Sequence, residues 1–190
     1  SNDATQTTTA NQPQIVSSGA VIVENGKPAV KFDGSNDTLE SASNVVSNSA
    51  MSLFMPYKFD NTASRPQDVV MSSTTDGFKY GMSGSGKDQY ANYSLLEVTT
   101  WANTITTQRL DSLFSVNSGG AILYINSILQ SATGTAGIVG NNTATLKIGS
   151  RDLTSAYFNG KIHEAIIYAS DQSSNRTNIE DNINTFYSIT

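Results

Sequence analysis

One segment near the first third of the chain places a large apolar residue at every second position. In MSLFMPYKF these residues are Met51, Leu53, Met55, Tyr57 and Phe59. Because successive side chains of a β-strand point to opposite faces, this spacing predicts a strand with one buried face. Pro56 lies within it, and since proline cannot donate a ladder hydrogen bond, we expect it at a sheet edge or a bulge.

Similar short apolar runs recur along the chain and are separated by Gly, Asn, Ser and Asp. They predict further strands at residues 69–71, 78–82, 90–98, 113–116, 121–125, 128–130, 145–149 and 158–168. Asn25-Gly26, between β-branched residues, predicts a hairpin because a type I′ turn needs positive φ at both central positions. The pattern is typical of an antiparallel sandwich of two sheets.

The C-terminal segment departs from the β pattern. Ile179, Ile183 and Phe186 recur at helical spacing, and Ser173 or Ser174 is available as the N-cap. We therefore predict one short C-terminal α-helix in an otherwise all-β chain.

The N-terminal segment sets the expected boundary of the domain. Residues 1–13 are polar and end at Pro13, which indicates an extended lead-in segment, so we expect a single sandwich domain over 14–190. The first residue is Ser, and we expect the chain to be a piece of a longer protein.

Composition excludes several classes of function. The chain has 190 residues and a net charge of −5, which argues against nucleic acid because phosphate binding needs a basic surface. It has no cysteine, and its one histidine, His163, is the sole candidate base for a Ser-His-Asp triad. No apolar run approaches ~18 residues, so no membrane insertion is expected.

Four segments occur in a fixed order from about residue 25 to the end. They are NGKPAVKFDGSNDTLE with MSLFMPYKF after it, AILYINSILQS, TLKIGSRDLTSAYFNGKIHEAIIY, and SDQSSNRTNIEDNINTFYSI. Together they resemble the laminin-G-like, concanavalin A-like jelly-roll superfamily, which contains lectins, glycosidases and bacterial surface modules. The resemblance implies an antiparallel two-sheet jelly-roll β-sandwich. The wording SDQSSNRTNIE is also similar to copies in tail and other virion proteins of bacteriophages.

The residues in the middle of the chain suit carbohydrate binding, which needs aromatic faces for stacking and polar groups for hydroxyls. The candidate binding residues there are Tyr80, Tyr90, Asn92, Tyr93 and Trp101, and they are joined by Arg151 and Asp152 in the loop before the last long strand. The alternative is that Trp101 and several of the tyrosines belong to the core or to a subunit interface, and the sequence leaves both readings open.

Catalysis has weaker support in the sequence. Hydrolytic members of the superfamily resemble one another in carrying carboxylates at alternate positions of one strand, and no strand here has such a pair, although distant carboxylates could still converge. Glu164 alternates with apolar residues, and we interpret it as a structural carboxylate rather than a catalytic acid. We assign no catalytic residues.

An acidic turn and a glycine-rich loop resemble ligand-binding motifs, and both have a simpler structural interpretation. Asp33, Asn36 and Asp37 are weak candidates for a calcium site, because Asx-turn chemistry explains them without an ion, and no other cofactor is indicated. GMSGSGKD (81–88) resembles a P-loop, but the residues after it read as a strand, so we expect a glycine-rich hairpin loop.

We therefore predict a non-catalytic, lectin-like domain of a bacteriophage virion protein, in a tail, fibre or surface decoration. Its expected partners are cell-surface glycans or neighbouring virion subunits, at the virion surface or outside the cell, with oligomerisation through the parent protein. Two alternatives are a purely structural virion module that binds no sugar and a glycoside hydrolase of the same fold.

Overall fold

The computed structural model describes residues 3–46, 50–63, 66–72, 77–92, 97–103, 107–116, 120–131, 133–134 and 144–189. For 92, 97–99, 101–103, 116 and 133–134 it describes the backbone alone.

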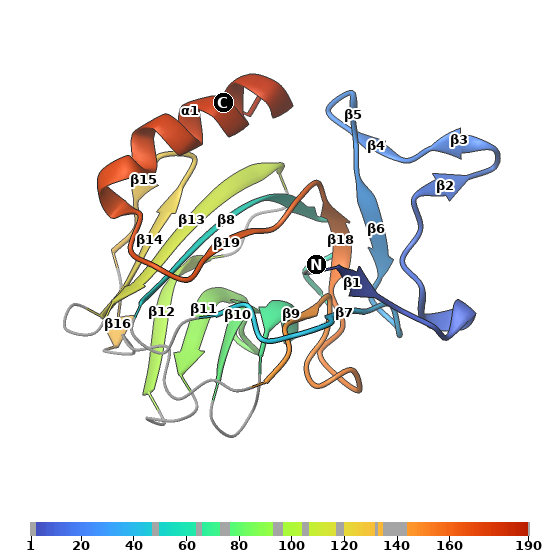
Figure 1. Ribbon diagram of the computed structural model, residues 1–190, viewed down its shortest axis with the longest axis horizontal. Helices are drawn as coiled ribbons and strands as arrows, with labels where there is room; N and C mark the ends of the chain where they lie inside the picture. Colours follow the sequence, from blue (N-terminus) through green and yellow to red (C-terminus); the bar gives the residue numbers. More distant parts are fainter. Residues whose placement is uncertain are drawn as a thin grey trace.

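Two antiparallel sheets face each other across one interior (Figure 1). The eight-stranded sheet has the order β1 (Ala4–Thr5), β7 (Leu39–Ser41), β17 (Lys147–Ile148), β9 (Gln67–Met71), β10 (Phe78–Met82), β11 (Lys87–Asn92), β12 (Glu97–Asn103) and β16 (Thr133–Gly134). The seven-stranded sheet has the order β15 (Ile128–Leu129), β14 (Gly120–Ile125), β13 (Arg109–Val116), β8 (Ala50–Phe59), β18 (Asn159–Ile162) and β6 (Val30–Asp33), with β19 (Ile166–Tyr168) also paired to β8. The predicted all-β antiparallel sandwich is confirmed.

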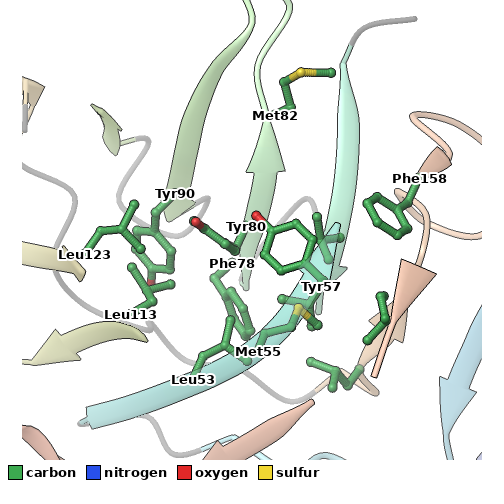
Figure 2. Packing of buried hydrophobic residues seen from close by; sticks show 14 of the residues in the cluster. Leu53, Met55, Tyr57, Phe78, Tyr80, Met82, Tyr90, Leu113, Leu123 and Phe158 are labelled. Atoms are coloured by element: carbon green, nitrogen blue, oxygen red, sulfur yellow. The ribbon is translucent and has the colours of Figure 1, made fainter. Parts of the chain in front are cut away.

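The interior is built from alternate residues of each inner strand, as the sequence predicts. Met51, Leu53, Met55, Tyr57 and Phe59 of β8 are all fully buried in one core cluster. Figure 2 shows side chains of β8 facing those of β10 and β11 across this interior. The burial of large side chains from both layers supplies the main driving force for folding.

The helix α1 (Arg176–Tyr187) covers the outer face of the seven-stranded sheet, so the predicted C-terminal helix is confirmed. Ile183 and Tyr187 pack there against Phe54. Two details differ from the prediction. Phe186 is 54% exposed while Tyr187 takes the buried position, and the predicted N-cap serines lie in a preceding 3₁₀ turn, η2 (Ser173–Asn175).

The hairpin predicted at Asn25-Gly26 is confirmed between β4 (Val23–Glu24) and β5 (Lys27–Pro28). Both turn residues have positive φ, 49° and 73°. The side chain of Asn25 also donates hydrogen bonds to the carbonyls of Tyr187 and Ser188, at 2.9 and 2.8 Å. The turn therefore supplies donors to the carboxyl end of the helix, where carbonyls lack partners of their own.

The last long strand predicted from the sequence is instead two strands, β18 and β19. Ile162 lies opposite Tyr57 and Ile166 opposite Phe54, so the register on β8 moves by one residue between the two pairs. This β-bulge lies next to Pro56. Because β8 is an inner strand, the predicted edge position for Pro56 is wrong. The predicted bulge is present, but the extra residue lies in the neighbouring strand rather than in β8.

The strand predicted at 90–98 is likewise divided, into β11 and β12, and residues 93–96 lie outside the described part. The lead-in segment pairs with the body of the sandwich, because Ala4 lies opposite Ser41 at the edge of the eight-stranded sheet. It continues through the 3₁₀ turn η1 (Thr9–Asn11).

A second hairpin, β2 (Val16–Ser17) and β3 (Ala20–Val21), projects from the body beside β4 and β5 (Figure 1). Within the described ranges, no helix is long and apolar enough to cross a membrane.

Gly160 in β18 has no room for a side chain, because the backbone of β8 and the ring of Phe158 lie against it. A Cβ there would lie 2.0 Å from the Lys58 carbonyl oxygen and 2.5 Å from Phe158 Cζ. We expect Gly160→Ala to lower the free energy of unfolding by about 1–3 kcal/mol in urea denaturation, as overpacking does. Gly84→Ala is the matched control, since a Cβ at Gly84 meets nothing within 4 Å. Equal stability of the two variants would contradict the close approach.

Candidate functional site

Two of the predicted sugar-binding tyrosines are core residues. Tyr80 and Tyr90 are fully buried between the sheets, with their rings among those in Figure 2. The Tyr80 hydroxyl donates to Asp111 Oδ2 at 2.5 Å, and the Tyr90 hydroxyl lies 3.2 Å from Ser115 Oγ. Burial raises the pKa of both phenols. Neither ring has a face for a sugar, so the prediction fails for these two residues because their side chains point inward.

An ionic cluster lies beside these tyrosines in the interior. Arg109 Nη2 donates to Asp88 Oδ1 at 2.7 Å, to Asp111 Oδ2 at 2.6 Å and to the Tyr57 hydroxyl at 2.7 Å. Burial raises the pKa of Asp111, although the adjacent guanidinium opposes the shift. Two distant carboxylates thus converge, but both are fully buried and a polysaccharide cannot reach them. The cluster links the two sheets.

Three other predicted residues are placed only in part. Tyr93 lies outside the described residues. The backbones of Asn92 and Trp101 belong to β11 and β12, and their side chains lie outside the described part of the chain.

The outer face of the eight-stranded sheet carries the remaining predicted residues. Strand register aligns one row of residues across it: Thr5, Glu40, Lys147, Met71, Lys79 and Ala91. Residues directly opposite in antiparallel strands share a face. Their sequence neighbours Val70, Tyr80 and Leu39 pack in the interior, so this row faces away from the core.

Arg151 and Asp152 lie in the turn that follows β17, and Arg151 reaches from it to β9. Arg151 makes a two-pronged ion pair with Asp68, with Nε 2.7 Å from Oδ2 and Nη2 3.2 Å from Oδ1. Lys79 Nζ lies 3.6 Å from the same carboxylate. Burial lowers the pKa of Lys79, and the charge of Asp68 offsets part of that effect. One buried carboxylate therefore fixes both cations.

A polar cleft opens between this turn and the sheet edge formed by β1 and β7. Its volume is about 340 Å³, and its lining residues are Thr5, Gln6, Thr7, Glu40, Ser41 and Leu153. We call it the rim cleft. No local sequence pattern predicts this cleft, because β1 and β7 are more than thirty residues apart in the chain and meet only in the folded sheet.

The groups in the rim cleft are held by bonds to the protein. Gln6 Oε1 accepts a hydrogen bond from Thr8 N at 2.9 Å. Glu40 accepts one from the Thr145 hydroxyl and lies 3.7 Å from Lys147 Nζ. Such fixed polar groups lower the entropy lost when a ligand binds.

The weak calcium candidates form a self-contained turn. Asp33 Oδ1 accepts hydrogen bonds from the amides of Ser35 and Asn36, and Asp37 Oδ2 accepts one from Asp33 N at 2.9 Å. Asp33 and Asp37 line a small pocket together with the cationic Lys31. Within the described residues, no three acidic or histidine side chains gather as metal ligands would. Asx-turn bonding accounts for these residues.

His163 and Glu164 serve the packing of the terminal helix. His163 Nδ1 lies 2.8 Å from the Pro28 carbonyl, which can only accept, so Nδ1 carries the proton. Burial lowers the pKa of this imidazole. Burial raises the pKa of the Tyr187 phenol, and the charge of Glu164 raises it further. The position of Glu164 beside the terminal helix fits its interpretation as a structural carboxylate.

The P-loop-like segment is a hairpin, as expected. It joins β10 directly to β11, with Ser83 N donating to the Lys87 carbonyl at 2.8 Å. A phosphate-binding loop opens a helix, whose amides hold the phosphates, and a strand follows here instead.

No known sequence family and no curated protein matches this chain. Solved structures do match it. Domain 4 of AbnA, a GH43 extracellular arabinanase from Geobacillus stearothermophilus, in complex with arabinotriose, superposes with a TM-score of 0.59 at 16% identity, over 83% of this chain and 80% of that domain.

Binding domains of botulinum neurotoxin DC also match. The domain in complex with rat synaptotagmin II gives a TM-score of 0.62 at 12% identity, over 98% of this chain and 45% of that one. The domain in complex with SialylT gives 0.60 at 13% identity, over 93% and 44%. The chain thus spans about half the length of the neurotoxin domains. At these identities the likeness establishes the β-sandwich fold.

The Asp68 carboxylate should stabilise the turn that bounds the rim cleft. We expect Asp68→Asn to lower the free energy of unfolding by roughly 1.5–3 kcal/mol, because Lys79 and Arg151 then lose their shared counter-ion. Asp152→Asn is the matched control, since Asn also tolerates the positive φ of 49° at that position. Thermal denaturation of both variants measures the difference, and an Asp68→Asn variant as stable as the control would refute this role.

Proposed function

We propose that this chain is a non-catalytic carbohydrate-binding domain and that the rim cleft holds the sugar. The observation that carries the proposal is the chemistry of the cleft, which combines hydroxyls, an amide and a carboxylate with one apolar side chain. Saccharides present hydroxyls that both donate and accept, together with apolar C–H faces. The matching arabinanase domain, solved with arabinotriose, supports the same reading by analogy of fold.

Each lining group has a part in this proposal. The carboxylate of Glu40 accepts hydrogen bonds from sugar hydroxyls, and charge assistance makes such bonds stronger than neutral ones. The hydroxyls of Thr5 and Thr7 donate or accept as the sugar requires. Leu153 covers the apolar face of the ring.

The charges around the cleft favour neutral sugars over acidic ones. Lys147 lies beside Glu40, and Arg151 and Lys79 lie beside Asp68. Each cation therefore already has an anionic partner and attracts an acidic saccharide only weakly. The small cleft also implies low affinity per site, which several copies on one particle raise through effective concentration.

We further propose that this domain works at the surface of a bacteriophage virion or at another extracellular surface. This rests on the similarity of SDQSSNRTNIE to virion proteins. A structural virion module that binds no sugar is the alternative, favoured by the exposed apolar hairpin β2–β3. A glycosidase is less well supported, because the converging carboxylates Asp88 and Asp111 are buried.

Isothermal titration with neutral oligosaccharides, beginning with arabinotriose, tests the proposal. We expect millimolar to micromolar binding with no sugar released. Glu40→Gln should weaken it about tenfold, the equivalent of ~1.4 kcal/mol. Lys87→Ala, an exposed position at the start of β11, is the control and should bind as the wild type does.

Two results would count against the proposal. Failure to bind any neutral saccharide on a broad glycan array would favour the structural module. Release of reducing sugar from a polysaccharide would favour a glycosidase.

A further inference from the structure

Strand β19 has one unpaired edge. It pairs with β8 on one side, and within the described residues no strand pairs with its other side. The Pro56 carbonyl accepts a hydrogen bond from His163 N, so the even-numbered residues of β8 turn their backbone groups toward β18 and β19. Phe54 lies opposite Ile166, and pairing groups alternate along a strand. The N–H and C=O of Ile167 therefore point away from β8, toward the open edge.

An apolar cavity adjoins this edge, where the two sheets part. Its volume is about 430 Å³, and it is lined by Ala4, Ser41, Val45, Leu146, Ile148, Ala165, Ile166 and Ile167. Several of these side chains pack on the main core, so the cavity opens directly onto the interior of the sandwich. An unpaired edge beside an apolar cavity suits an added strand, whose main chain pairs with the edge and whose side chain enters the cavity.

The same chain carries a segment of matching character. Hairpin β2–β3 and its flanks expose Ile15 (62%), Val16 (50%), Val21 (57%) and Val23 (50%). We call residues 15–23 the arm. In the described structure β2 and β3 pair only with each other, so each strand has a free outer edge. Contiguous exposed apolar residues mark a contact surface, and the arm projects from the body where another molecule can meet it (Figure 1).

We propose that the arm of one copy of this chain docks on the β19 edge of a second copy. Both surfaces offer an unpaired strand edge, and the apolar side chains of the arm match the apolar lining of the cavity. The contact joins two different surfaces of the chain, so it is reciprocal in a closed dimer or repeats head to tail in a longer assembly.

Sedimentation velocity across a concentration series tests the proposal, and two variants separate the two surfaces. We expect the wild type to associate as concentration rises. Val16→Asp with Val21→Asp places charges on the arm at exposed positions. Ala165→Arg places a charge in the cavity. Each variant should weaken association at least tenfold.

Mixing the arm variant with the cavity variant is the decisive step. One intact arm and one intact cavity remain in such a mixture, so heterodimers should form although neither variant self-associates. Circular dichroism on each variant confirms that the fold is retained, and Ile128→Asp with Leu129→Asp is the control, since β15 is equally exposed at the far end of the sheet.

Three outcomes would overturn the proposal. These are a wild type that stays monomeric throughout, a mixture that does not form heterodimers, and a β15 variant that loses association as the arm variant does.

Discussion

The packing of alternate side chains of β8 against those of β10 and β11 decides where every other feature of the molecule can lie. It commits large aromatic residues to the interior, where Tyr57 and Tyr80 share hydrogen bonds with Asp111. The guanidinium of Arg109 completes this cluster and ties the two sheets together. Since these groups are fully buried, recognition of a ligand is left to the outer surfaces and the sheet edges.

The outer surfaces differ in what covers them. Helix α1 packs on the outer face of the seven-stranded sheet, where Phe54 meets Ile183. The outer face of the eight-stranded sheet carries paired charges instead, and its edge contains the rim cleft. This asymmetry places the proposed sugar site on one side of the sandwich and the free edge of β19 where the two sheets part.

Much of the fold follows from local sequence. Alternation identified the buried face of β8, and Asn25-Gly26 located a hairpin through its demand for positive φ. Pro56 predicted an edge or a bulge, but the place of that bulge, between β18 and β19, could not be predicted, because it depends on which distant strand pairs beside the proline. Nor could spacing choose between Phe186 and Tyr187, since adjacent aromatic residues fit the helical stripe about equally well. Less of the site was predictable. Leu153, which follows Arg151 and Asp152 in the chain, lines the cleft, whereas Glu40 and the residues of β1 reach it only through long-range pairing.

A crystal structure of the protein soaked with arabinotriose addresses the location of the sugar site most directly. We expect a saccharide in the rim cleft, with hydroxyls bonded to the carboxylate of Glu40 and a ring face against Leu153. A saccharide bound elsewhere, for example along β12 beside Trp101, with the rim cleft holding only solvent, would contradict it.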